Sequence, residues 1–244
     1  MRQKTVCMIF VCAGFFLYAL PAGAEESLPS WFLPLRDAIY EQNLNADEVA
    51  VLYREVKAEA EKLSGAERLV MLSRVEYMMG RAYHYEERKD EAVSRYDAGM
   101  ARAEAALKIK DSAEGWQMLA ENLSQACAVR STMYAMTNGL NVEKYAKKAL
   151  EKNTGNTAAL FMIAARWVYA PSPFNNIRKG IQMMQDILTR FEALMPPDDL
   201  FNVYSSIGYG YLQQKKNADA KTWLLKSLEM YPTNKYVQGL CENL

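Results

Sequence analysis

The chain has 244 residues, with 29 basic and 29 acidic side chains and a single histidine. Half of its residues are hydrophobic, which is typical of a globular protein with a substantial core. Because the net charge is zero, there is no electrostatic reason to expect nucleic acid or anionic lipid as the main partner.

The first 24 residues have the pattern of a secretory signal peptide. Arg2 and Lys4 precede an apolar run over 6–20, and the small residues that end at Ala24 match a cleavage site. An uncleaved membrane anchor is the alternative, but the run is shorter than the roughly 20 apolar residues that a spanning helix needs. We therefore expect cleavage near Ala24 and a periplasmic or secreted protein.

The rest of the chain has the spacing of helices. Apolar residues recur every three or four positions, and no β-branched alternation indicates a strand. The sequence therefore predicts an all-α fold. In chain order we expect an atypical N-terminal helix pair over 25–65, four repeat units over 66–232 and a C-terminal capping helix over 233–244.

The first repeat unit is expected over residues 73–104. It carries small and aromatic residues at fixed positions: Met79, Gly80, Tyr83, Ala92, Tyr96 and Gly99. A glycine or alanine lets the two helices of a hairpin approach closely, and a tyrosine fills the space beside it.

The middle of the chain is harder to divide. Helices are expected over 114–136 and 142–152, with Asn138-Gly139 between them, but their repeat frame is not fixed by the sequence.

A further unit begins near Thr157, and the segment YAPSPFNN at 169–176 interrupts it. Its two prolines bias the residues before them away from helix, and its asparagines suit a turn and a cap before a helix that restarts at Ile177. This loop is either an inserted turn or an element that shapes a binding site or subunit contact.

The last unit matches the tetratricopeptide pattern most specifically. Its positions hold Tyr204, Ile207, Gly208, Tyr211, Ala220, Leu224, Ser227 and Pro232. With the first unit, this constellation makes the chain resemble exported bacterial tetratricopeptide-repeat (TPR) proteins. The resemblance implies a TPR-like α-solenoid of antiparallel helix hairpins, with divergent middle repeats and a C-terminal capping helix.

More loosely, the export signal, the divergent repeats and the interruption APSPFNNIRKG resemble the T-component of TRAP-type transporters. That resemblance implies a periplasmic solute-binding protein as partner and a homo-oligomer with a ligand-accessible pore. Two functions therefore stay open: a scaffold that binds another protein, and a transport-associated subunit that binds or passes a small apolar solute. We expect Phe161, Trp167 and Tyr169 to face a groove in the first case and a closed apolar cavity in the second.

TPR arrays bind peptides or helices on a concave face lined by the first helix of each unit. Carried onto this chain, the family's groove positions are Arg74, Tyr77, Arg81, His84 and Tyr85 in the first unit, Phe161, Ala165, Val168 and Tyr169 in the third, and Asn202, Ser205, Tyr209, Leu212 and Gln213 in the last. Tyrosine and arginine are common interface hot spots. Tyrosines at these spacings also pack between repeats, so both roles remain open.

Arg74 and Arg81 are seven residues apart and therefore share one helix face. Our hypothesis is that they bind a carboxylate group of the partner.

The usual constellations of enzymes are absent from the sequence. It has no cysteine pair at metal-ligand spacing, no glycine-rich phosphate loop and no serine elbow. We therefore expect no catalysis, no cofactor and no metal. Cys127 and Cys241 are expected to be two buried thiols, because several helices of the repeat stack would separate them.

Overall fold

The computed structural model describes residues 28–242 and 244, so the predicted signal peptide lies outside the described residues. Within that part of the chain every regular element is a helix, as predicted. The helices are α1 Leu33–Glu41, α2 Ala46–Glu61, α3 Gly65–Tyr85, α4 Lys89–Ile109, α5 Ala113–Val129, α6 Thr132–Lys152, α7 Thr157–Tyr169, α8 Ile177–Phe191, the 3-10 helix η1 Glu192–Leu194, α9 Pro197–Gln213, α10 Asn217–Met230 and α11 Lys235–Glu242.

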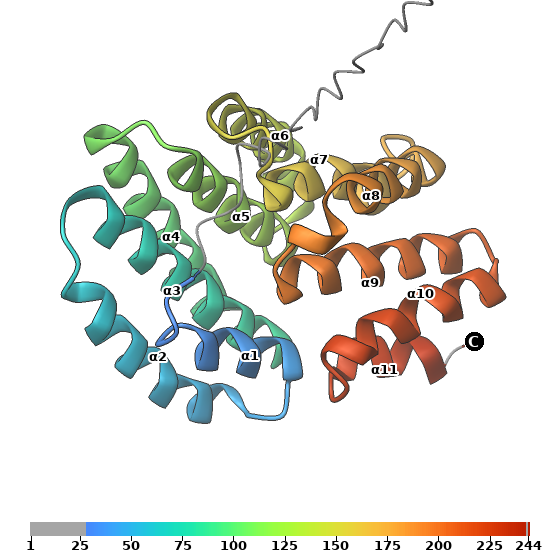
Figure 1. Cartoon of the computed structure of the whole chain (residues 1–244), viewed down its shortest axis with the longest axis horizontal. Coiled ribbons are helices and arrows are strands. Elements are labelled where there is room, and N and C mark those ends of the chain that lie inside the picture. Colours follow the sequence, from blue (N-terminus) through green and yellow to red (C-terminus); the bar gives the residue numbers. More distant parts are fainter. Residues whose placement is uncertain (1–27, 243) are drawn as a thin grey trace, which may run out of the picture.

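Consecutive helices pack as hairpins. The hairpins are α3 with α4, α5 with α6, α7 with α8, and α9 with α10, and α4 also packs closely against α5. The pairs follow one another in an arc, and α1 lies on its inner side (Figure 1). The protein is a TPR-like α-solenoid, which confirms the predicted fold class.

The small residues of the repeat pattern lie at the closest approaches of helices. A Cβ atom on Gly80 would lie 2.5 Å from the ring of Tyr96, and one on Gly208 would lie 2.7 Å from Leu224. Ala92 and Ala220 are fully buried in the second helices of the same pairs. The two clear repeat units therefore pack in the way that their sequence pattern predicts.

The predicted helix break at Asn138-Gly139 is wrong. The chain turns earlier, at Arg130 and Ser131, and α6 then continues through Gly139 to Lys152. The Ser131 hydroxyl accepts a hydrogen bond from the Tyr134 amide, which caps the new helix. A glycine costs only about 1 kcal/mol inside a helix, so one glycine does not end it.

The proline segment separates α7 from α8. The Trp167 carbonyl accepts a hydrogen bond of 2.9 Å from the Asn176 amide, which closes the loop. The Asn176 side chain accepts from the Lys179 amide at 3.1 Å and caps α8, so the predicted restart at Ile177 is confirmed. Phe174 at the tip of the loop is 58% exposed.

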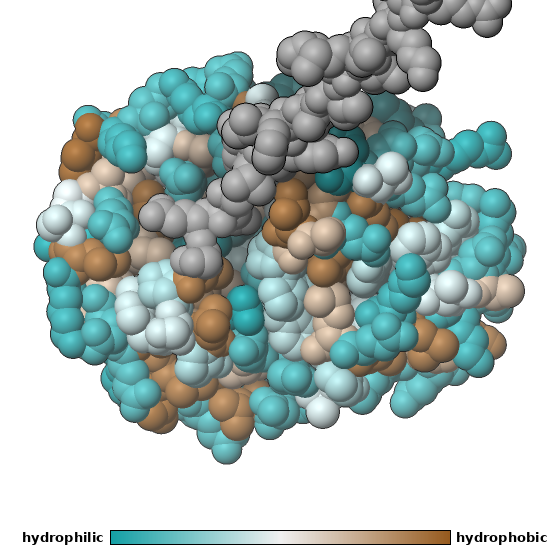
Figure 2. Space-filling model, viewed as in Figure 1, coloured by the Kyte–Doolittle hydropathy of each residue, from teal (hydrophilic) through white to brown (hydrophobic). Residues whose placement is uncertain are grey.

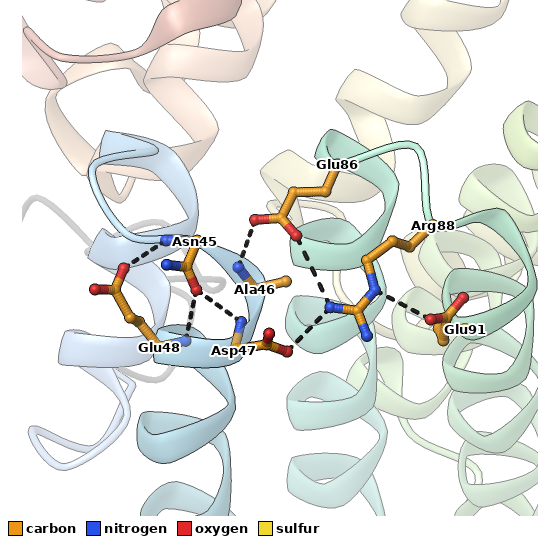
Figure 3. A network of polar contacts seen from close by, with 7 residues as sticks. All are labelled: Asn45, Ala46, Asp47, Glu48, Glu86, Arg88 and Glu91. Carbon is orange, nitrogen blue, oxygen red and sulfur yellow. Dashed lines mark hydrogen bonds and ion pairs between the residues drawn. The ribbon is translucent and has the colours of Figure 1, made fainter.

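A polar network holds the start of α2 against the turn between α3 and α4 (Figure 3). Asn45 and Glu48 form a capping box at the start of α2. The Glu86 carboxylate accepts a hydrogen bond of 2.7 Å from the Ala46 amide. Arg88 lies 3.0 Å from Asp47, so two residues of the turn grip one helix end.

The two ends of the solenoid meet. The Asn234 side chain donates to the Tyr40 carbonyl at 2.6 Å, and the Thr233 hydroxyl donates to the Glu41 carbonyl at 2.7 Å. The Tyr40 ring packs against Phe201 and Tyr231 of the last repeat unit. The N-terminal helix therefore covers the last repeat as well as the first, which the sequence did not predict.

Candidate functional site

The N-terminal helix α1 changes the face that was predicted to be a groove. Arg74, Tyr77 and Arg81 of α3 are each at least nine-tenths buried. Whether they contact a partner stays a prediction, but in this structure they line the interior of a closed arc.

Arg81 lies among tyrosine rings. Its guanidinium is 4.3 Å from the ring centre of Tyr40 and 5.7 Å from that of Tyr77. Its Nε donates to the Tyr85 hydroxyl at 3.0 Å. Cation–π contacts strengthen when they are desolvated, so Arg81 stabilises the joint between α1 and α3. Arg81, one of the two arginines predicted to bind a carboxylate of the partner, is therefore enclosed by tyrosine side chains of this chain.

Four tyrosines from four helices gather at the C-terminal end of α3, and we call them the tyrosine cluster: Tyr85, Tyr169, Tyr209 and Tyr236. The rings of Tyr169 and Tyr209 stack with their centres 5.2 Å apart. The Tyr169 hydroxyl lies 2.9 Å from that of Ser206, and a further hydrogen bond joins it to Tyr236.

The tyrosine cluster is both accessible and surrounded by protein. Tyr85, Tyr169 and Tyr236 are 41%, 47% and 46% exposed. Burial nevertheless raises the pKa of Tyr169 to about 12. Burial also raises the pKa of Tyr236, and the neighbouring Tyr169, Tyr209 and Tyr85 add to that effect. The cluster therefore combines exposed ring surface with partly desolvated hydroxyl groups.

A cavity of about 260 Å³ lies beside α1 and α3. It is lined by Leu28, Tyr40, Arg74, Tyr77, Met78, Gln117, Glu121, Ala193, Leu194, Met195, Pro196, Asp198, Asp199 and Asn202. These residues come from α1, α3, α5, η1 and α9 and from the segments beside them. Arg81 lies between this cavity and the tyrosine cluster, since it contacts the cavity residues Tyr40 and Tyr77 on one side and Tyr85 on the other.

Hydrogen bonds hold several of the polar side chains around the cavity. Gln117 donates to Glu121 at 2.9 Å and accepts from Asn156 at 2.7 Å. Thr157 donates to Asp199. Asn202 donates to the Tyr40 hydroxyl at 2.9 Å. These hydrogen bonds fix the positions of the polar side chains in the wall.

Two of the three acidic residues of the cavity lie at the start of α9. Asp198 and Asp199 lie in its first turn, where the helix dipole stabilises carboxylates. Burial raises the pKa of Asp198, while Arg36, Arg74 and Arg81 act in the opposite direction. The sequence had given these two residues no role, because acidic residues are ordinary at a helix start.

His84 should make stability depend on pH. Burial, with repulsion from Arg81 and Lys89, lowers the pKa of His84 below its usual 6.5, and a hydrogen bond with Gln125 opposes this. The neutral form is thus favoured in the folded state. We expect the contribution of His84 to the free energy of unfolding to be complete above about pH 6.5. This contribution should be lost as the pH falls towards the lower pKa of the folded state.

The measurement is urea unfolding of the wild type and of His84→Gln between pH 7.5 and pH 5, together with an NMR titration of the imidazole. The chain has one histidine, so the titration is unambiguous. The variant should lose part of the pH dependence. A midpoint at or above 6.5 would contradict the prediction.

The other predicted groove residues are dispersed. Asn202 lines the cavity. Val168 and Ser205 are buried. Gly180 of α8 packs directly against the Val168 side chain, where a larger residue would not fit. Phe161 packs among core residues of α7 and its neighbours, and Gln213 is exposed at the end of α9. The structure thus unites Tyr85, Tyr169 and Tyr209 and adds Tyr236, which sequence reasoning missed because it lies in the capping helix.

The three aromatic side chains that were to separate the two functions do not line the cavity. Phe161 is half-buried in the core, Trp167 lies under Lys179 at 3.7 Å, and Tyr169 belongs to the tyrosine cluster. The cavity itself has charged and amide side chains in its wall. Apolar side chains such as Leu28, Met78 and Leu194 lie in the same wall, so the lining is mixed.

One helix carries exposed apolar residues away from the core. Met133, Met136 and Leu140 on α6 are 72%, 63% and 64% exposed and share one face, since they are three and four residues apart. On the face of the molecule in Figure 2, apolar residues form separate patches among hydrophilic ones. The α6 face is thus a second candidate surface for binding a partner, and experiments on the tyrosine cluster need a control variant on it.

Cys127 and Cys241 are free thiols, as predicted, but each is half-buried instead of buried. Over residues 28–242 and 244, no helix is long and apolar enough to cross a membrane. The same residues contain no cluster of three or more His, Cys, Asp or Glu side chains that could hold a metal ion.

Comparison with known proteins gives little more. No protein-family model matches the chain, and no curated protein matches it. Among solved structures it is similar to the crystal structure of YrrB, described as a TPR protein with an unusual peptide-binding site, over 88% of this chain and 91% of that one. The sequence identity is 12% and the TM-score is 0.37. The fold assignment above rests on the helix pairs and helix contacts of this chain.

Proposed function

We propose that the protein is a non-enzymatic, exported scaffold that binds a segment of a partner protein at the tyrosine cluster. The observation that carries this proposal is the meeting of four tyrosines from α3, α7, α9 and α11, three of them more than 40% exposed. Export is supported by the sequence of the first 24 residues.

Tyrosine suits such a surface for two reasons. Its ring offers a large apolar contact area at a small cost in side-chain entropy, and its hydroxyl can hydrogen-bond to a peptide backbone. The cluster is held in place by the stacking of Tyr169 on Tyr209 and by the bond to Ser206. A surface that is already ordered loses less entropy when it binds.

The test begins with cross-linking of the exported chain in its native compartment, followed by mass spectrometry of the captured proteins. The affinity of the captured partner is then measured by calorimetry for Tyr169→Ala and Tyr209→Ala. We expect each variant to weaken binding about tenfold or more, as for hot-spot residues. Capture of a solute-binding protein or a permease would place the scaffold in a transport system.

Two controls separate this surface from the others. Leu225→Ala removes a side chain on α10 that is 46% exposed, as Tyr236 is, and should leave the affinity unchanged. Met136→Ala tests the α6 face. Unchanged affinity in both tyrosine variants, with a loss in Met136→Ala, would show that α6 binds the partner and that the proposal is wrong.

A further inference from the structure

The cavity beside the tyrosine cluster has one buried carboxylate oxygen that the protein leaves without a hydrogen bond. Asp198 is 7% exposed, and its Oδ1 accepts no hydrogen bond from the described residues. Arg36 forms an ion pair with this oxygen at 3.7 Å, which is too long for a hydrogen bond. Arg36 also pairs with Asp37, at 2.7 Å.

A buried carboxylate oxygen that lacks a hydrogen-bond donor is costly, even though the rest of the Asp198 carboxylate has partners. Desolvation without compensating hydrogen bonds disfavours the charged form, and burial does raise the pKa of Asp198. An N–H or O–H group that entered the cavity could donate the hydrogen bond that this oxygen lacks.

The charges on the cavity wall favour a cationic donor. Glu121, Asp198 and Asp199 line the cavity together with a single guanidinium, that of Arg74. Arg36 and Arg81 act on Asp198 from outside the lining, and each is shared with other groups: Arg36 with Asp37, and Arg81 with tyrosine rings. Opposite charges within a few ångströms interact strongly when they are partly removed from water.

The size of the cavity limits its occupant. A volume of about 260 Å³ is slightly below the range of about 300–1,000 Å³ that is usual for drug-sized ligands. It suits one long side chain better than a whole ligand. Tyr40 and Tyr77 in the wall offer aromatic surface to the stem of such a side chain.

We propose that this cavity binds the cationic end of an arginine or lysine side chain from the partner protein. The proposal rests on the proposed function and sharpens it: the partner segment would place a basic residue in the cavity while its neighbours contact the tyrosine cluster. Asp198 and Glu121 accept the hydrogen bonds of the cation. This assignment replaces the hypothesis that Arg74 and Arg81 together bind a carboxylate.

The test uses small probes and needs no partner. Calorimetric titration of the purified chain with N-acetyl-L-arginine amide should give a dissociation constant on the order of 1 mM, as expected for so small a probe. N-acetyl-L-citrulline amide has nearly the same shape without the charge, and it should bind at least tenfold more weakly. N-acetyl-L-lysine amide shows whether the cavity prefers a guanidinium or an ammonium group.

Two variants locate the site. Asp198→Asn and Glu121→Gln should each weaken binding of the arginine probe about tenfold, and circular dichroism should show that both are folded. Asp186→Asn removes one charge from an exposed position on α8 and should leave the affinity unchanged. Because Glu121 is less buried than Asp198, its variant keeps the test valid if Asp198→Asn does not fold.

The outcomes distinguish this inference from the proposed function. Equal binding of the arginine and citrulline probes, or no binding of either at 10 mM, would overturn the cavity assignment and leave the tyrosine cluster as a binding surface. Binding of the arginine probe that depends on Asp198 and Glu121 supports the assignment even if the tyrosine variants bind the partner normally.

Discussion

Replacing Tyr40 with alanine is expected to lower the free energy of unfolding by about 3–5 kcal/mol, the usual cost of removing a large buried aromatic side chain. Tyr40 is 2% exposed. Its ring centre lies 5.4 Å from that of Phe201, 5.1 Å from that of Tyr231 and 4.3 Å from the Arg81 guanidinium. One substitution thus removes contacts to α3, to α9 and to the end of α10. Urea unfolding followed by circular dichroism measures the loss.

The matched control is Tyr40→Phe. It keeps the ring and its stacking and removes only the hydroxyl that accepts a hydrogen bond from Asn202 at 2.9 Å. Its cost should be about 1 kcal/mol. Hydrogen exchange gives a second readout: α1 amides should exchange faster in Tyr40→Ala than in Tyr40→Phe. A loss under about 1 kcal/mol in the alanine variant would show that α1 does not hold the two ends of the solenoid together.

The helix pairs were predictable because each depends on residues close together in the sequence. Gly80 with Tyr96 and Gly208 with Leu224 are local contacts of one hairpin, and their spacing alone indicates the packing. The turn at Ser131 was missed because a serine cap is a weaker signal than Asn138-Gly139, although the cap bond forms and the glycine is tolerated.

The candidate site was predictable only in part, because it depends on contacts between distant segments. Tyr85, Tyr169 and Tyr209 occupy groove positions of their own repeat units, so the family pattern found them. The closure of the arc joins Tyr40 to Asn234, which are far apart in the chain, and no local pattern encodes such a pairing. That closure buries Arg74 and Arg81.

The same limit applies to charges that hold repeat units together. Glu76 stands in α3 among apolar residues, and its side chain is 2% exposed. Three partners reach it from two other helices: the Tyr53 hydroxyl of α2 at 3.1 Å, and Arg95 and Arg102 of α4 at 3.2 and 3.1 Å. The sequence shows a carboxylate on a core face but not which partners neutralise it.

Glu76→Ala is expected to cost about 3 kcal/mol, the low end of the range for breaking a buried ion pair, because both arginines are partly exposed and can turn to water. Glu91→Ala is the control: Glu91 is exposed and pairs with Arg88 on the surface, so its removal should not shift the urea midpoint.

A double-mutant cycle with Arg102→Met apportions the effect at Glu76. If the pair acts as a unit, the double variant should be no less stable than Glu76→Ala alone, since an arginine without its carboxylate adds nothing. Additive losses would show that Glu76 stabilises α3 through Tyr53 and Arg95 instead. In either case the interface of α2, α3 and α4 depends on one buried charge, whereas the closure at Tyr40 depends on aromatic packing.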